Sequence, residues 1–188
     1  MLLTLGATLS GGGAEYLDSC LARIAANGDT EALSGLYERT HAAIYGYALS
    51  LLKNAQDAED VMQDTFVRAY HSAQQYREPG KPMAWLMTIA RNEALGRIRA
   101  RGRTVTMSPE DWQEQFADRP DVSQEDLLTL RALLDTLSDE EREIVTLHAL
   151  TGLKHREIAA LLELALPTVL SKYNRAIKKL GKSLKEAE

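Results

Sequence analysis

Apolar side chains recur at a spacing of three and four residues in three successive runs, and this is the feature that most limits the fold. The runs cover residues 29–52, 58–73 and 83–98. Such spacing places the apolar residues on one face of an α-helix. Five prolines in 188 residues interrupt little of the chain, and we find no long alternating run between hairpin turns that would predict strands. The sequence therefore predicts an all-α fold.

Breaks in the helical pattern divide the chain into two small domains. Residues 76–82, YREPGKP, contain two prolines around a glycine and predict a loop inside the first domain. Residues 104–122 are polar and acidic and predict a linker. Two serines, Ser123 and Ser138, each precede an acidic residue by three positions, the spacing of a helix-capping box. We expect a flexible leader over 1–14, a first domain of three to four helices over 15–103 and a second over 123–188.

Basic residues are concentrated at the C-terminal edge of each predicted domain, although the chain as a whole has a net charge of −5. Residues 91–103 contain five arginines and one acidic residue, and residues 172–185 contain six basic residues and no acidic one. The linker carries much of the negative charge. A phosphate backbone responds to such local clusters and not to net charge, so the distribution is compatible with nucleic-acid binding.

Residues 155–180 predict two short helices around a tight corner. On a helical wheel of the second helix, Val169, Tyr173, Ala176 and Ile177 gather on one side, with Leu170 at its edge, where we expect it to pack. The opposite side carries hydroxyl, amide and cationic groups, which contact phosphates and base edges in a major groove. The layout predicts a helix-turn-helix, whereas the polar face alone is equally typical of a solvated helix.

Enzymatic and membrane functions find little support in the sequence. Gly80-Lys81 is followed by Pro82, so it is no phosphate-binding loop, and the four histidines show no metal-ligand spacing. We therefore expect neither a catalytic site nor a metal or other cofactor. One cysteine, Cys20, suits a reducing cytoplasm, and we expect no segment that inserts into a membrane.

Three stretches resemble bacterial RNA polymerase sigma factors of the sigma-70 family, in the extracytoplasmic-function group. DAEDVMQDTFVRAY (57–70) and WLMTIARNEALGRIRARGR (85–103) resemble region 2, and EIAALLELALPTVLSKYNRAIKKL (157–180) resembles region 4. The matches occur in the family order. The resemblance implies a protein that binds core RNA polymerase, recognises double-stranded promoter DNA and opens it.

The resemblance assigns three sets of residues. Polymerase binding falls to the helix that begins near Asp57, through Asp57, Asp60, Gln63, Asp64, Phe66 and Val67. The structural alternative is that Asp57 caps that helix and that its carboxylates complement the N-terminal helix dipole, and both roles can hold. The melted minus-ten element would be bound by Tyr76, Arg77, Lys81, Arg91, Asn92, Arg97 and Arg99. The minus-thirty-five element would be bound by Arg156, Thr168, Ser171, Lys172, Arg175 and Lys178.

Some positions leave alternatives open. Trp85 could stack on a base or fill the core, and we favour the core. The helix that carries Arg97 and Arg99 either continues past Gly96 or frays there. Glu163 stands where the corner of a helix-turn-helix commonly has glycine, and Ala165 stands where a capping Ser or Thr is common.

A rival interpretation is a stand-alone helix-turn-helix regulator without a role as a polymerase subunit. It would need a ligand-binding or phosphoacceptor module in the first domain, and we find neither. A third interpretation is a decoy that binds polymerase without opening promoters. The family resemblance further implies an anti-sigma factor as a partner that masks the binding faces. The acidic linker is expected to act as a solvated tether, and its charge could keep the protein closed against the basic clusters.

Overall fold

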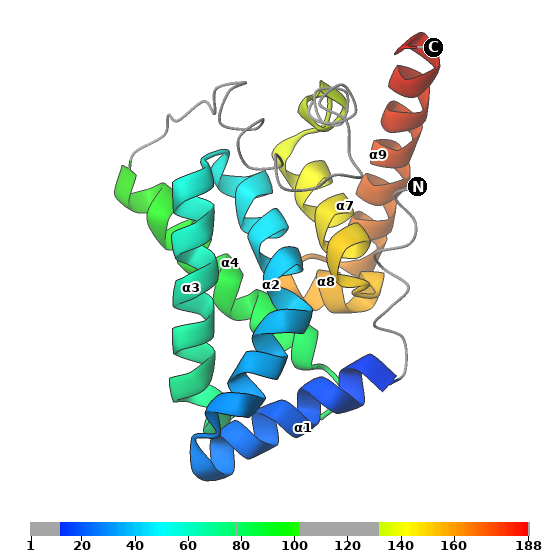
Figure 1. Cartoon of the computed structure of the whole chain (residues 1–188). Helices are drawn as coiled ribbons and strands as arrows, with labels where there is room; N and C mark the ends of the chain where they lie inside the picture. The colour runs from blue at the N-terminus through cyan, green and yellow to red at the C-terminus, as the bar shows by residue number, and fades with distance from the viewer. Residues whose placement is uncertain (1–11, 78, 102–131, 188) are drawn as a thin grey trace.

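The computed structural model describes residues 12–77, 79–101 and 132–187, and these parts of the chain are helical without a strand (Figure 1). The expected all-α class is confirmed. The linker residues 104–122 and the capping box at Ser123 lie outside the described residues. The elements are α1 (Gly12–Asn27), α2 (Thr30–Leu52), α3 (Ala55–Ser72), the short 3₁₀ helix η2 (Ala73–Gln75), α4 (Pro82–Arg101), α7 (Asp139–Thr151), α8 (His155–Leu161) and α9 (Leu166–Ala187).

Local sequence signals explain where the helices of the first half begin and end. Asp29 caps α2 by accepting a hydrogen bond from the Ala32 N–H at 3.0 Å, as its position predicts. Lys53 ends α2 in the left-handed conformation, with φ of 51°. Asn54 then caps α3 by accepting from the Asp57 N–H at 2.8 Å. Asp57 is therefore not the cap, which lies three residues earlier, but it is buried in the first turn of α3, where a negative charge complements the helix dipole.

Helix α1 begins at Gly12, so residues 12–14 of the expected leader are helical. It lies across one end of α2, where the Tyr16 hydroxyl is in close contact with the position of Gly35 (Figure 1). The guanidinium of Arg39 lies 4.0 Å from the centre of the Tyr16 ring, a distance at which a cation is attracted to an aromatic face. Leu17 and Leu21 are fully buried and anchor α1 to the core.

In the second half of the chain, helix α7 has the expected cap at its start. Ser138 and Glu141 form a reciprocal capping box at the start of α7. Gly152 ends that helix with φ of 69°, and its N–H donates to the His148 carbonyl. Helices α8 and α9 then pack against each other and against α7.

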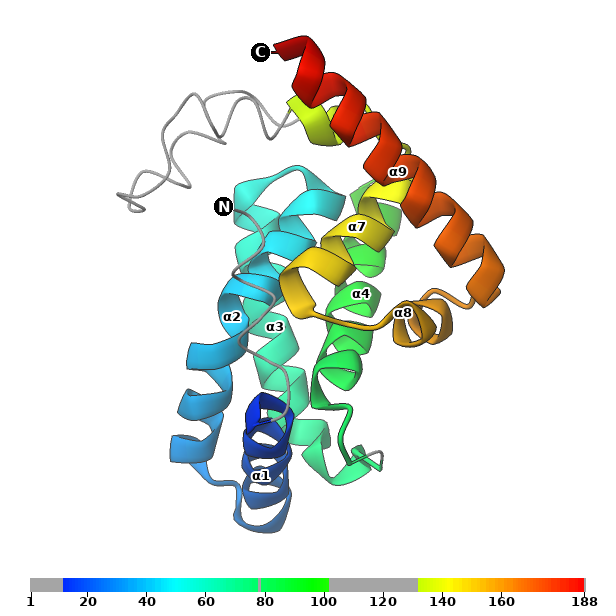
Figure 2. The same ribbon diagram turned by 90° about the vertical axis from the view of Figure 1, so that its right-hand side faces the viewer.

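Helix α7 packs on α2, and α8 packs on α4, so one hydrophobic core runs through both halves. Figure 2 shows α7 lying between α2 and α9. The approach is close, because a Cβ added to Gly46 of α2 would lie 2.8 Å from Leu150 Cδ1 of α7. Within the described residues, none of the helices combines the length and apolar character needed to cross a membrane.

A buried polar contact joins the two halves at the centre of this interface. The fully buried Tyr47 on α2 donates its hydroxyl to Glu143 Oε1 on α7 at 2.7 Å, and Arg91 Nε on α4 lies 3.0 Å from the same oxygen. Burial, and then the charge of Glu143, raise the pKa of the Tyr47 hydroxyl well above its ordinary value. The hydroxyl therefore stays protonated as a donor, and the carboxylate keeps two partners.

We expect Tyr47→Phe to lower the free energy of unfolding by about 1.5–3 kcal/mol, because it removes a buried hydrogen bond to a charged acceptor. Urea denaturation measures the change. The matched substitution Tyr37→Phe, at a 39% exposed position on the same helix, should change stability by no more than about 0.5 kcal/mol. Equal effects of the two substitutions would contradict a specific role for the Tyr47 hydroxyl.

Candidate nucleic-acid interface

The corner between α8 and α9 has a defined hydrogen-bond geometry. The Leu164 N–H donates to the Ala159 carbonyl at 2.9 Å and the Glu163 N–H to the Ala160 carbonyl at 3.3 Å, which is the pattern of a Schellman motif. Glu163 occupies the left-handed position with φ of 56°, where glycine is favoured. Ala165 precedes α9, and its carbonyl accepts from the N–H groups of Thr168 and Val169. The predicted helix-turn-helix layout is thus present, with both unusual residues at its corner.

Helix α9 presents a polar face to solvent. Ser171, Arg175 and Lys178 are exposed at spacings of four and three residues, and Arg156 is exposed on α8. Thr168 is half-buried at the start of α9. The exposed groups thus offer hydroxyl and cationic donors along one side of a helix, as contacts to phosphates and bases require.

The apolar face of α9 is narrower than the wheel predicts. Val169 and Ala176 are fully buried, but Ile177 is 44% exposed. Leu170 is 40% exposed, so the expectation that it packs is wrong. The wheel places both residues correctly in angle, but it carries no information on where the neighbouring helices end.

Carboxylates at the start of α7 hold two of the lysines of α9. Lys172 pairs with Glu140, and Lys179 Nζ lies 2.6 Å from Glu141 Oε2. Glu141 is 2% exposed, and the hydrogen bond from Lys179 lowers the pKa of its carboxyl group. Arg175 Nε lies 4.0 Å from the same carboxylate. The sequence predicted Glu141 only as part of a capping box and Lys179 only as part of a polar helix face. It did not pair these groups, because nothing in a sequence pairs positions more than thirty residues apart.

An aromatic cluster lies where α7, α8 and α9 meet. The rings of His148 and His155 stack with centroids 4.7 Å apart, and Tyr173 of α9 meets both edge-on. His148 Nδ1 lies 2.9 Å from the Leu153 carbonyl, whereas His155 Nε2 is buried without a hydrogen-bond partner. Burial, and then the neighbouring His148, lower the pKa of His155. Among the described residues, no group of three or more His, Cys, Asp or Glu side chains is arranged to hold a metal ion.

The residues expected to bind polymerase do not form one exposed row on α3. Gln63 and Val67 are exposed one turn apart, and Val67 is 56% accessible. Asp57 and Phe66 are buried, at 2% and 6%. Of the residues expected to bind polymerase, the accessible ones on this helix are therefore Gln63, Val67, Asp60 and Asp64. Phe66 lies in the core beneath them.

Arg97 of α4 forms ion pairs with two of these carboxylates. Its guanidinium nitrogens lie 3.1 Å from Asp60 Oδ2 and 2.5 Å from Asp64 Oδ2. Residues expected to bind different partners are thus in contact in this arrangement. Helix α4 continues past Gly96 to Arg101, so it does not fray at Gly96, and Arg99 is exposed on it.

The remaining minus-ten residues lie on the segment between η2 and α4 and on α4 itself. Arg77, Lys81 and Asn92 are exposed, and Tyr76 is half-buried. The Trp85 ring packs against the core with its centroid 5.5 Å from that of Tyr76, in agreement with the favoured core role. Arg91 is turned toward the second half, where it contacts Glu143.

The fold is a helical bundle joined to a helix-turn-helix unit with an exposed basic face, which defines a DNA-binding protein of the transcription machinery. The sigma-70 region 2 model matches residues 36–104, and the sigma-70 region 4 model matches residues 127–180. Together they cover more than half of the chain. The chain belongs to the sigma-70 family of RNA polymerase sigma factors, and the relatives described next place it in the extracytoplasmic-function group. The match to region 2 disfavours the stand-alone regulator.

Relatives and solved structures agree with this assignment. The chain is 38% identical over 164 residues to the sigma factor SigE of Mycolicibacterium smegmatis. This alignment covers 82% of this chain and 63% of SigE. It is 32% identical over 172 residues to SigL of Mycobacterium tuberculosis, covering 88% of this chain and 97% of SigL.

Two solved complexes have the same fold. CnrH, solved with the cytosolic domain of CnrY, aligns with a TM-score of 0.66 at 26% identity, over 92% of this chain and 99% of CnrH. The sigma factor RpoE of Bartonella quintana, solved with the anti-sigma factor NepR, aligns with a TM-score of 0.64 at 28% identity, over 81% of this chain and 96% of RpoE.

We expect Glu163→Gly to raise the free energy of unfolding by about 0.5–1 kcal/mol, because it relieves a non-glycine residue in the left-handed region. The measurement is chemical denaturation at neutral pH. Glu163→Ala is the matched control, since it removes the same charge but keeps the Cβ that causes the strain. A gain of equal size in both variants would indicate that charge, and not backbone conformation, is responsible.

The pH dependence of stability should report His155. Its pKa is lower in the folded protein than in the unfolded chain, so the unfolded state binds more protons as pH falls below about 6.5. This contribution is full above that pH and is lost as the pH falls toward the lower folded pKa. We expect His155→Phe to show a smaller loss of stability between pH 7.5 and pH 5.5 than the wild type. The exposed His71 provides the control His71→Phe, which should follow the wild type.

Proposed function

We propose that this chain binds core RNA polymerase, directs it to promoters and helps to open the duplex at the start of transcription. The observation that carries the proposal is that one chain contains both region 2 and region 4. Region 4 supplies the exposed polar face of α9 for double-stranded DNA. Region 2 supplies helix α4 and the segment between η2 and α4 for the melted strand. The chemistry on the chain's own side is recognition, with no catalytic group assigned.

The polymerase-binding surface is proposed to be the exposed part of α3. Val67 offers an apolar contact at one end of this surface, and Gln63, Asp60 and Asp64 offer hydrogen-bond acceptors on the turns before it. Val67→Glu should lower the affinity for core polymerase, because it places an unpaired charge in an apolar contact. Because Arg97 already neutralises Asp60 and Asp64, their aspartate charges would be available to polymerase only in part or after rearrangement of that ion pair.

The two halves are proposed to separate when the protein acts. Arg91, assigned to the minus-ten element, is in contact with Glu143 in the described arrangement, so the contact must break before the arginine can reach DNA. A partner that stabilises the closed form would act as an inhibitor. The complex of RpoE with the anti-sigma factor NepR supports an anti-sigma factor as such a partner. We place the protein in the cytoplasm, where polymerase and DNA are found.

The test is transcription by purified core polymerase across a library of upstream sequences, with and without this protein. Transcripts that share an upstream motif only when the protein is present support the proposal. Polymerase binding without initiation would favour a decoy, and DNA binding without polymerase binding would favour a regulator.

On a promoter found in that screen, we expect Arg175→Ala to weaken binding by the holoenzyme and to reduce the slope of log affinity against log salt by about one. The reason is the loss of one phosphate contact on α9. Lys178→Ala should act similarly, and the charge-preserving control Lys178→Arg should retain the wild-type slope. Fluorescence anisotropy over a range of salt concentrations measures both quantities. An unchanged slope in both alanine variants would remove this face from the DNA interface.

A further inference from the structure

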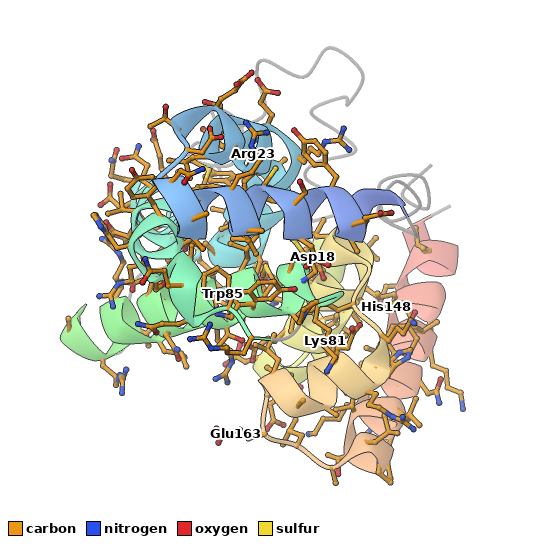
Figure 3. The ribbon with its side chains drawn as sticks, turned by 90° about the horizontal axis from the view of Figure 1, so that it is seen from below. Asp18, Arg23, Lys81, Trp85, His148 and Glu163 are labelled. Carbon is orange, nitrogen blue, oxygen red and sulfur yellow. The ribbon has the colours of Figure 1, made fainter. Side chains whose placement is uncertain are left out.

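One carboxylate from α1 holds the segment between η2 and α4. The Tyr76 hydroxyl donates to Asp18 Oδ1, and the Gly80 N–H donates to Asp18 Oδ2 at 2.6 Å. The Lys81 N–H donates to the Tyr76 hydroxyl oxygen at 3.2 Å. The two oxygens of Asp18 therefore bind both ends of a five-residue stretch. Figure 3 shows Asp18 pointing from α1 toward the segment that leads into α4.

The backbone at Gly80 is shaped to make this contact. Its φ of +88° lies in the region that residues with a side chain rarely adopt, although an added Cβ would meet nothing within 4 Å. The glycine is therefore needed for the direction of the backbone and not for space. That direction aims its N–H at Asp18. On the other side of the segment, the Tyr76 ring packs against Trp85.

Asp18 itself sits on a rigid support. Leu17 and Leu21 next to it are fully buried, so α1 is fixed relative to the core. A carboxylate is a poor ligand for DNA, because phosphates repel it. Here both oxygens accept hydrogen bonds from the protein, so the charge is directed at the segment. Helix α1 lies before residue 36, where the region 2 match begins.

We propose that Asp18 is a positioning residue for strand opening. It sets the conformation of the segment that carries Tyr76, Arg77 and Lys81, so that these groups are already in place when the melted strand arrives. Preorganisation of this kind raises affinity by removing the entropy cost of ordering a loop on binding. The inference rests on the proposed function of the segment and adds a residue from α1 to it.

The test uses the full chain assembled with core polymerase. The probe is a fluorescent single-stranded oligonucleotide with the non-template minus-ten sequence of a promoter from which the wild type initiates. Asp18→Ala should weaken binding of this probe about tenfold, because the segment loses both hydrogen bonds that order it and must then be ordered on binding. Affinity for core polymerase should stay within about twofold. Glu15→Ala, at an exposed acidic residue one turn earlier on α1, should leave all of these affinities unchanged.

Amide hydrogen exchange on the full chain without polymerase distinguishes positioning from general stability. In Asp18→Ala, the amides of Gly80 and Lys81 should exchange faster, whereas those in α2 and α3 should keep their wild-type protection. Asp18→Asn is a near-isosteric second variant that preserves the fold. It removes the negative charge and keeps a single acceptor oxygen, so the hydrogen bonds to the segment weaken and the Gly80 amide should lose part of its protection.

A coupling measurement completes the test. Tyr76→Phe should weaken binding of the probe in the wild-type background. In the Asp18→Ala background it should cause little further loss of affinity, because both substitutions break the same contact. Unchanged probe affinity despite faster exchange at Gly80 would overturn the inference, and so would a loss of protection throughout the chain. A wild-type protein that initiates at no promoter would instead contradict the proposed function, and exchange would still decide whether Asp18 anchors the segment.

Discussion

The buried contact of Glu143 with Tyr47 and Arg91 sets the arrangement of the whole molecule. A carboxylate removed from water is costly unless donors replace its hydration, and here one donor comes from α2 and one from α4, whereas the carboxylate belongs to α7. The contact therefore favours the closed placement of the second half over displaced ones. The close approach of α2 and α7 at Gly46 supports the same placement, since a larger residue there would meet Leu150.

Cationic side chains with proposed roles in DNA binding have carboxylate partners within the protein, both within each half and between the halves. Arg91 contacts Glu143, Arg97 contacts Asp60 and Asp64, and Lys172 contacts Glu140. Most of these pairs are partly exposed, and exposed pairs contribute little to stability and weaken with salt. DNA phosphates could thus replace them at a small free-energy cost. Of these pairings, the one between Arg91 and Glu143 joins the two halves, so under the proposed function it would couple promoter binding to their separation.

Local sequence patterns were sufficient for much of the fold. Asp29 and Ser138 cap helices as their spacing predicts, and the break at residues 76–82 separates the helices in the expected place. The corner at Glu163 and Ala165 was likewise visible in the sequence. The polymerase-binding row was less predictable, because helical spacing cannot tell that Asp57 is buried and Val67 exposed. That difference depends on which face of α3 meets α2 and α4.

The sequence by itself therefore determined most of the helices, several of their ends and the membership of a sigma-factor family, because these depend on contacts within one or two helical turns and on motifs that are contiguous in the chain. It did not locate helix α1. Only the tertiary structure decided that Tyr47 and Arg91 share the Glu143 carboxylate, that Lys172 and Lys179 turn toward α7, and that Asp18 reaches the segment before α4. Each of these contacts joins side chains far apart in the chain. Their formation depends on how whole helices pack, and no local pattern encodes that.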